Sequence, residues 1–309
     1  MWFIFALITF FAWGAADLFY KKGAVESERY SHLLTSVSVG VVMGVMAVGT
    51  ILIRGIDYDP VNLLVYLPVS AMYILSMTVG YFGLRYLELS VSSPIQNASG
   101  AVTSVLLILV FRRIPDPVTA AAILLVTVGV VLLGVFERRE MAERLTADDK
   151  RYTIGFAAFF MPILYCVLDS FGTFLDGYYL DDFATTPLIG VTEENFEDVA
   201  NISYELTFFL VAVVLLVWLR FVKKEKIVLR RQGNRLTAAV LEAAGQFTYV
   251  YAMAGHAVAA APVIASYCVA SAVLARIFLG EKLARRQIAA VALVVGGILL
   301  LGLLEGLEG

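Results

Sequence analysis

The sequence has little cysteine and little charge, and it lacks the short motifs of common enzyme chemistries. Its two cysteines, Cys166 and Cys268, lie inside apolar runs, so no disulfide framework is indicated. Charged residues make up 16% of the chain, against roughly a quarter in a soluble domain, and no basic aromatic patch suggests a nucleic-acid partner. No His-Glu-x-x-His, Gly-x-Ser-x-Gly, Walker or Cys-x-x-Cys motif occurs. We therefore expect no enzyme, no metal site and no bound cofactor.

Apolar sequence is abundant instead, at 60% of the 309 residues and a mean hydropathy of +0.84. A membrane-spanning helix needs about 20 mostly apolar residues. Ten runs qualify, at 2–20, 31–53, 62–86, 91–111, 117–136, 153–179, 203–221, 236–254, 259–279 and 287–304. The first run precedes Lys21 and Lys22, the reverse of a cleavable signal peptide. The pattern predicts an all-α integral membrane protein of ten transmembrane helices, and we expect it in a prokaryotic plasma membrane.

Positive charge is strongly segregated between alternate loops. Of the 23 Lys and Arg residues, nineteen follow odd-numbered spans, within 21–30, 85–90, 137–152, 220–235 and 280–286. The loops after even-numbered spans hold Arg54, Arg112 and Arg113, and the loop at 180–202 is acidic with no Lys or Arg. Because cytoplasmic loops collect Lys and Arg, this bias predicts that both termini and the acidic loop are external.

The chain also contains an internal repeat. Residues 93–137 align without gaps on residues 261–305, and one offset of 168 pairs Pro94 with Pro262, Gly129 with Gly297, Gly134 with Gly302 and Glu137 with Glu305. The first spans align as well, with Asp17 opposite Asp169. We predict five-helix repeats at 1–137 and 153–309, joined by a cytoplasmic linker at 138–152. An odd helix count inverts one repeat relative to the other, an arrangement typical of transporters with a central solute site.

Two stretches resemble a known family. The sequence IFLGEKLARRQIAAVALVVGGILLLG at 277–302 resembles the closing helices of the EamA domain in the drug/metabolite transporter superfamily. The opening FFAWGAADLFYKKG at 10–23 is similar to the first helix of that family. The resemblance covers nearly the whole chain and implies a ten-helix transporter of amino acids, amines, sugars or nucleotide sugars. The related small multidrug transporters carry an acid in their first helix, so Asp17 and Asp169 could divide its cation and proton role.

Acidic residues inside apolar spans are the first candidates for a site, because such residues usually face a cavity or a partner. Asp169 shares a helix face with Thr173 and Asp176, and Glu242 shares one with Gln246 and Tyr249. A structural hydrogen bond to a neighbouring helix is the alternative for Asp169 and Glu242. For Asp17 the alternative is an ion pair with Lys21, four residues on.

Polar and aromatic residues near these acids complete the candidate site. Asn97 and Ser266 follow Pro94 and Pro262, where freed backbone groups could bind a ligand. An aromatic wall would suit an organic cation, and its candidates are Trp13, Tyr165, Tyr81 and Tyr249. Ordinary helix packing is the alternative for each of them, whereas Tyr20, Tyr178 and Tyr179 resemble residues of the membrane interface.

The leading hypothesis is a secondary transporter that moves a small metabolite or organic cation, in the export direction, by alternating access. Protons would be coupled through Asp169, Asp17 and Glu242. The alternatives are an uncoupled facilitator or exchanger of neutral or zwitterionic metabolites, a non-transporting membrane scaffold, and an intramembrane enzyme that uses paired aspartates. The expected partners are a small-molecule substrate and the lipid bilayer but no nucleic acid, with the protein as monomer or homodimer.

Overall fold

The computed structural model describes residues 1–112, 114–144, 150–225, 227–228, 231–281 and 284–308. In these ranges the chain is helical, with no strand. The helices of the first half are α1 (Trp2–Gly23), α2 (Ser31–Arg54), α3 (Asn62–Val65), α4 (Leu67–Gly83), α5 (Leu89–Gln96), α6 (Ser99–Phe111) and α7 (Pro117–Arg144). Those of the second are α8 (Lys150–Tyr179), α9 (Phe196–Val217), α10 (Gly233–Met253), α11 (Ala257–Ala265), α12 (Cys268–Phe278) and α13 (Arg285–Glu308).

Each of the ten predicted spans overlaps helical structure. Seven helical stretches in the described ranges are long and apolar enough to cross a membrane: α1, α2, α5 with α6, α7, α9, α11 with α12, and α13. The remaining three predicted spans correspond to α4, which has 17 residues, and to α8 and α10. The protein is therefore an integral membrane protein, and a total of ten spans is our proposal.

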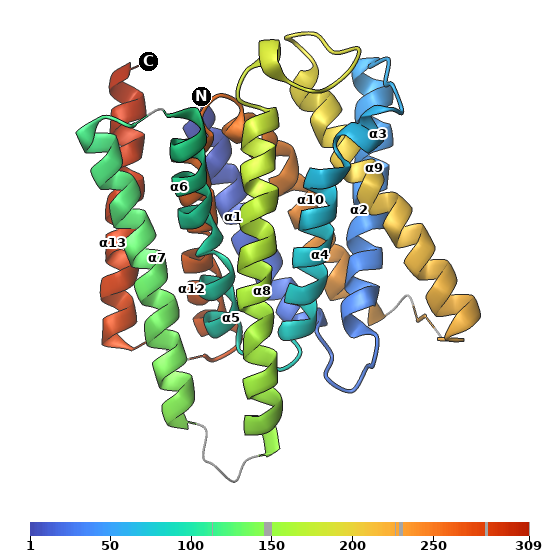
Figure 1. Cartoon of the computed structure of the whole chain (residues 1–309). Coiled ribbons are helices and arrows are strands. Elements are labelled where there is room, and N and C mark those ends of the chain that lie inside the picture. The colour runs from blue at the N-terminus through green and yellow to red at the C-terminus, as the bar shows by residue number, and fades with distance from the viewer. Residues whose placement is uncertain (113, 145–149, 226, 229–230, 282–283, 309) are drawn as a thin grey trace.

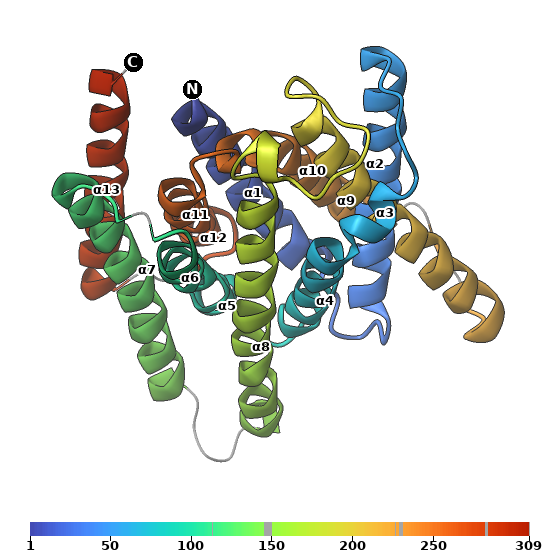
Figure 2. The same cartoon turned by 45° about the horizontal axis from the view of Figure 1, so that its top comes forward.

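The helices stand side by side, and both chain ends lie at the same end of the bundle (Figure 1). The segment between α8 and α9 lies at that end too, whereas the end of α7 and the start of α8 lie at the opposite end (Figures 1 and 2). The linker predicted at 138–152 has other bounds in the structure, because α7 extends to Arg144 and α8 begins at Lys150. Residues 145–149 lie outside the described residues. Because α1 and α8 start at opposite ends, they run in opposite directions.

Two predicted spans are broken at matching places. The span at 91–111 divides into α5 and α6 around Asn97, and the span at 259–279 divides into α11 and α12 around Ser266. Each break follows a proline inside the helix, Pro94 in α5 and Pro262 in α11, and proline removes a helical hydrogen bond. Pro262 leaves the Val258 carbonyl without its helical donor, and the Ser104 hydroxyl of α6 donates to it at 3.1 Å. At the breaks themselves, Asn97 Nδ2 donates to the Ser93 carbonyl at 2.8 Å, and the Ser266 hydroxyl donates to the Val263 carbonyl.

The prediction of the acidic loop at 180–202 is wrong at its end, because α9 begins at Phe196 and takes up the last seven residues. Glu197 and Asp198 lie in its first turn, where the helix dipole favours negative charge. Asp198 also accepts hydrogen bonds from Arg54 Nη1 at 2.5 Å and from the Tyr251 hydroxyl at 2.6 Å. Hydropathy alone predicted too late a start for this helix, because Glu197 and Asp198 lower the mean hydropathy of its first turn.

The most extensive contacts between helices join the two halves: α1 with α10, α2 with α9, α7 with α13, and α4 with α8. The α7–α13 contact is reciprocal. A Cβ added to Gly129 would lie 2.6 Å from Val294 Cγ2, and one added to Gly297 would lie 2.7 Å from Val126 Cγ2. Gly129 and Val126 precede Gly297 and Val294 by the same 168 residues, so each half presents the same surface to the other.

Candidate functional site

A cavity lies between the two halves. Eight helices line it, α1, α4, α5, α6 and α8 to α11, together with the breaks at Asn97 and Tyr267. Its polar wall includes three carboxylates, Asp17, Asp169 and Glu242. Eight aromatic side chains complete that wall: Trp13, Tyr20, Tyr73, Tyr81, Tyr165, Tyr204, Tyr249 and Tyr267. In the described part of the chain no Lys, Arg or His lines it, so the cavity carries only acidic titratable charge.

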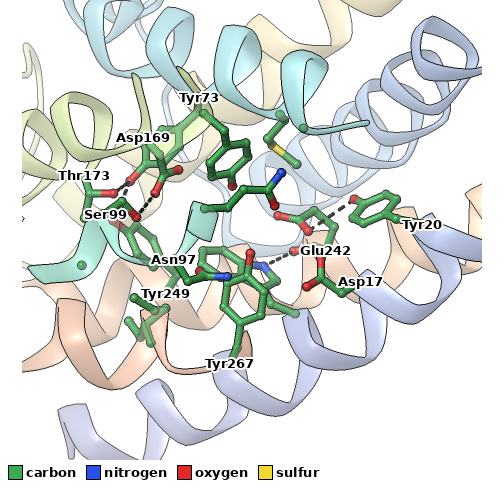
Figure 3. A pocket seen from close by; sticks show the side chains of 18 of the residues that line it. Asp17, Tyr20, Tyr73, Asn97, Ser99, Asp169, Thr173, Glu242, Tyr249 and Tyr267 are labelled. Atoms are coloured by element: carbon green, nitrogen blue, oxygen red, sulfur yellow. Dashed lines mark hydrogen bonds between the residues drawn. The ribbon is translucent and has the colours of Figure 1, made fainter. Parts of the chain in front are cut away.

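Asp17 and Glu242 lie on one side of the cavity and Asp169 on the other (Figure 3). Asp17 is buried, and its Oδ2 accepts hydrogen bonds from the hydroxyls of Ser93 at 2.6 Å and Ser271 at 2.7 Å. These serines belong to α5 and α12, so one carboxylate joins three helices from both halves. Lys21 does not pair with it; its Nζ donates to the carbonyls of Leu84 at 2.8 Å and Leu87 at 2.5 Å. The predicted alternative of an ion pair between Asp17 and Lys21 is therefore wrong.

Glu242 is buried in α10 beside α1. Its Oε2 accepts a hydrogen bond from the Tyr20 hydroxyl at 3.3 Å, and its backbone carbonyl accepts one from Trp13 Nε1 at 3.2 Å. The Trp13 ring fits here because Gly245 lies one turn along the same helix: a Cβ there would lie 2.4 Å from the indole. The two hydrogen bonds hold the aromatic side chains of Tyr20 and Trp13 beside Glu242.

Asp169 lies on α8, partly buried, with Oδ2 accepting a hydrogen bond from the Ser99 hydroxyl at 2.6 Å. Ser99 begins α6 after the break in the first broken span. One turn further along α8, Thr173 Oγ1 accepts a hydrogen bond from Tyr73 at 2.9 Å, and the Tyr73 and Tyr249 hydroxyls lie 2.7 Å apart. These contacts tie α4, α8 and α10 together across the cavity.

The space in the cavity is small. Its volume of about 60 Å³ is room for roughly four to six water molecules at 10–15 Å³ each. Polar contacts link the helices on both sides of this level. The Tyr73–Tyr249 pair lies toward the chain termini, and Lys21 holds the connection between α4 and α5 at the other end. An organic solute therefore needs the helices to move apart before it fits.

Comparison with protein families identifies this architecture. The model of the EamA-like transporter family matches residues 1–135 and 185–303. The chain belongs to the EamA-like transporter family. It is thus a membrane transporter of the drug/metabolite type, and its two matched regions agree with the two EamA-like repeats predicted from the sequence.

The fold agrees with a solved protein described only as "Crystal structure of protein". That protein has a TM-score of 0.65 and 16% sequence identity, and the similarity covers 100% of this chain and 99% of the other. At this identity the likeness shows the fold alone. No curated protein matches this EamA-like chain.

Eight of the ten substrate-site residues predicted from the sequence line the cavity of this EamA-like protein: Asp17, Asp169, Trp13, Tyr165, Tyr81, Tyr249, Glu242 and Asn97. Gln246 and Ser266 do not. Gln246 is buried in α10, and Ser266 donates to the backbone at the break between α11 and α12. Asp176 lies outside the cavity lining as well and accepts a hydrogen bond from Tyr66. In the described residues no group of three His, Cys, Asp or Glu is placed to hold a metal ion.

Several tyrosines that line the EamA-like cavity were not predicted from the sequence. Tyr20 was expected at the membrane interface, yet it is 4% exposed and bonded to Glu242, so that expectation is wrong. Tyr73 and Tyr204 were not singled out, although both line the cavity. The sequence around them gives no indication of a site, because an aromatic residue in an apolar span looks the same whether its side chain faces lipid, another helix or a cavity. The repeat register offered no help, since Tyr73 aligns with Leu241 at the offset of 168.

Proposed function

We propose that this protein is a secondary transporter of small organic cations. The observation that carries the proposal is the lining of the central cavity, which combines three carboxylates and eight aromatic rings with no basic side chain in the described residues. An ionised carboxylate at mid-membrane costs roughly 2.5–3.5 kcal/mol on insertion scales, and a bound cation would offset that cost. A ring face attracts a cation by about 0.5–2 kcal/mol, more when the cation is desolvated.

We further propose that protons compete with the cation for Asp169, Asp17 and Glu242. A bound proton and a bound organic cation each neutralise the charge of a buried carboxylate, so either one removes the cost of burying that charge. Asp17 and Asp169 come from the aligned first helices of the two halves, and their Oδ2 atoms both accept serine hydroxyls. Exchange of protons for cations at this pair would export the cation against its gradient.

Alternating access of two inverted halves is the mechanism that we propose for this exchange. Three features support it: α1 and α8 run in opposite directions (Figure 1), the contacts of Gly129 and Gly297 are reciprocal, and the cavity has room for only a few water molecules in this conformation. Rocking of inverted repeats around a fixed central site is a recurrent transporter plan. The Lys and Arg bias supports external termini in a prokaryotic plasma membrane, and we propose a monomer or homodimer.

Thermal stability of the purified protein tests the substrate class. We expect amines and quaternary ammonium compounds to raise the melting temperature in a concentration-dependent way, because a ligand that binds only the folded state stabilises it by mass action. Asp169→Asn should abolish the shift, whereas the exposed Asp116→Asn should leave it unchanged. A shift with sugars or zwitterionic amino acids, and none with amines, would contradict the proposal and favour an uncoupled facilitator.

Transport in proteoliposomes tests the coupling. We expect an imposed pH gradient to drive amine uptake by the wild-type protein and not by Asp169→Asn, with the variant still melting cooperatively. Normal pH-driven uptake by the folded variant would rule out a coupling role for Asp169.

A further inference from the structure

A second acid lies deep in the protein outside the central cavity. Glu205 lies in the middle of α9, is 1% exposed, and lines neither the central cavity nor the three other hollows around Asp57, His256 and Thr127 in the described residues. Both of its carboxylate oxygens lack a hydrogen-bond partner, and so does Oδ1 of Asn201, one helical turn earlier. Two neighbouring turns of α9 therefore hold three buried oxygens that can only accept hydrogen bonds and have no donor.

Helical periodicity places this pair against α2. Asn201, Glu205, Phe208 and Ala212 follow one another at spacings of four, three and four residues, so they share one face of α9. The lower part of that face touches Gly40 of α2, whose added Cβ would lie 2.3 Å from the Phe208 carbonyl oxygen and 2.5 Å from Ala212 Cβ. Every α2 residue from 39 to 49 is apolar, so this segment offers Glu205 no donor.

No charged group on the neighbouring elements compensates Glu205. The elements packed against α9 are α2, α3, α4, α10 and the π-helical turn Trp218–Val222. Their titratable groups are His32, Arg54, Tyr73, Tyr81, Arg220, Arg235, Glu242, Tyr249 and Tyr251, and α9 itself adds Glu197, Asp198 and Tyr204. None of them hydrogen-bonds or pairs with Glu205 in the described structure. Arg54, at the end of α2, binds Asp198 instead.

We propose that Glu205 is a proton-binding site that is distinct from the transport cavity and is occupied whenever α2 and α9 are packed together. A proton on one carboxylate oxygen supplies the missing donor, and Asn201 Oδ1, one helical turn earlier on the same face of α9, is the acceptor that we assign to it. A buried ionised carboxylate without a partner is strongly unfavourable, whereas a neutral acid bonded to an amide is not. Because α2 and α9 belong to different halves, separating them would hydrate Glu205 and release the proton.

Infrared difference spectroscopy of the full-length protein in nanodiscs tests the protonation directly. At pH 7 the change Glu205→Gln should remove a carbonyl band of a protonated carboxylic acid. The matched control Glu194→Gln, which changes an exposed acid of the outer loop, should remove only carboxylate bands. Loss of carboxylate bands alone in Glu205→Gln would overturn the proposal.

Melting temperature as a function of pH gives a second readout that needs no substrate. A group that is protonated in the folded state and ionised in the unfolded state makes stability fall as pH rises. Between pH 5 and pH 9 we expect a steeper fall for the wild type than for Glu205→Gln or for Glu205→Met, an apolar change that keeps similar bulk. Equal slopes in all three proteins would overturn the proposal. So would a stabilisation by NaCl over KCl that depends on Glu205, because the site would then hold a metal cation.

Discussion

At the scale of single residues, Arg235, at the start of α10, is a buried basic side chain that links the two halves of the chain. It is 1% exposed, and its guanidinium donates to Glu28 Oε2 at 2.6 Å, the Gln232 side chain at 2.7 Å, the Ser31 hydroxyl at 2.9 Å and the Gly23 carbonyl at 3.0 Å. One side chain therefore fastens the second half of the chain to the turn between α1 and α2. Five donors in a planar fork suit arginine and not lysine.

We expect Arg235→Met to lower the free energy of unfolding by about 3 kcal/mol, the lower end of the range for breaking a buried pair, because Glu28 is partly exposed. Unfolding in mixed detergent micelles measures the change. Arg220→Met, at an exposed position, is the control and should change little. A loss for Arg235→Met no greater than for the control would show that the hydrogen bonds of Arg235 contribute nothing net.

The acids of the cavity could be predicted from the sequence, whereas its tyrosines could be predicted only in part. Tyr81, Tyr165 and Tyr249 were expected there, but Tyr20, Tyr73 and Tyr204 were not. Asp17, Asp169 and Glu242 interrupt apolar runs, so their cost in a membrane marks them at once. The serines that bind Asp17 come from α5 and α12, and only tertiary packing brings them together. Glu205 lay just inside a predicted span at 203–221, yet its isolation depends on what α2 presents to it.

At the scale of helices, length and hydropathy predicted where helices lie, whereas hydrogen bonding decided where they break. The spans at 91–111 and 259–279 are continuous in hydropathy, and each contains a proline that sequence analysis noted. The breaks occur three or four residues after those prolines, where Asn97 and Ser266 bond to the backbone. Hydrogen bonds from side chains to the backbone depend on side-chain conformation, and a hydropathy profile carries no information about it.

Close contact between α7 and α13 depends on glycine, and the repeat predicts equal sensitivity on both sides. A Cβ at Gly129 would lie 2.9 Å from the Ala290 carbonyl oxygen, and a Cβ at Gly297 would lie 2.8 Å from that of Ala122. We expect Gly129→Ala and Gly297→Ala each to reduce stability by about 1–3 kcal/mol, as for overpacked cores. Thermal unfolding measures this.

Gly296→Ala is the matched control, because a Cβ at Gly296 meets nothing within 4 Å. Its neighbour Gly297 differs only in the helix face that it occupies. If all three variants melt alike, the close contact between α7 and α13 does not limit stability.

At the scale of the whole molecule, the external termini that we propose from the Lys and Arg bias can be tested by labelling. In a background without Cys166 and Cys268, we expect Glu194→Cys to react with a membrane-impermeant maleimide in intact cells. Lys223→Cys should react only after the membrane is opened, because Lys and Arg mark cytoplasmic loops. The reverse pattern would place both termini in the cytoplasm.

The strongest contacts of the bundle all cross between its halves, α1 with α10, α2 with α9, α7 with α13 and α4 with α8. During synthesis α1 to α7 are made before any of these partners exists. Until the second half follows, the glycine faces of the first half are unmatched and Asp17 lacks the hydroxyl of Ser271. The contacts between the halves therefore form late in biogenesis, and we expect chains truncated after α7 to be unstable in the membrane.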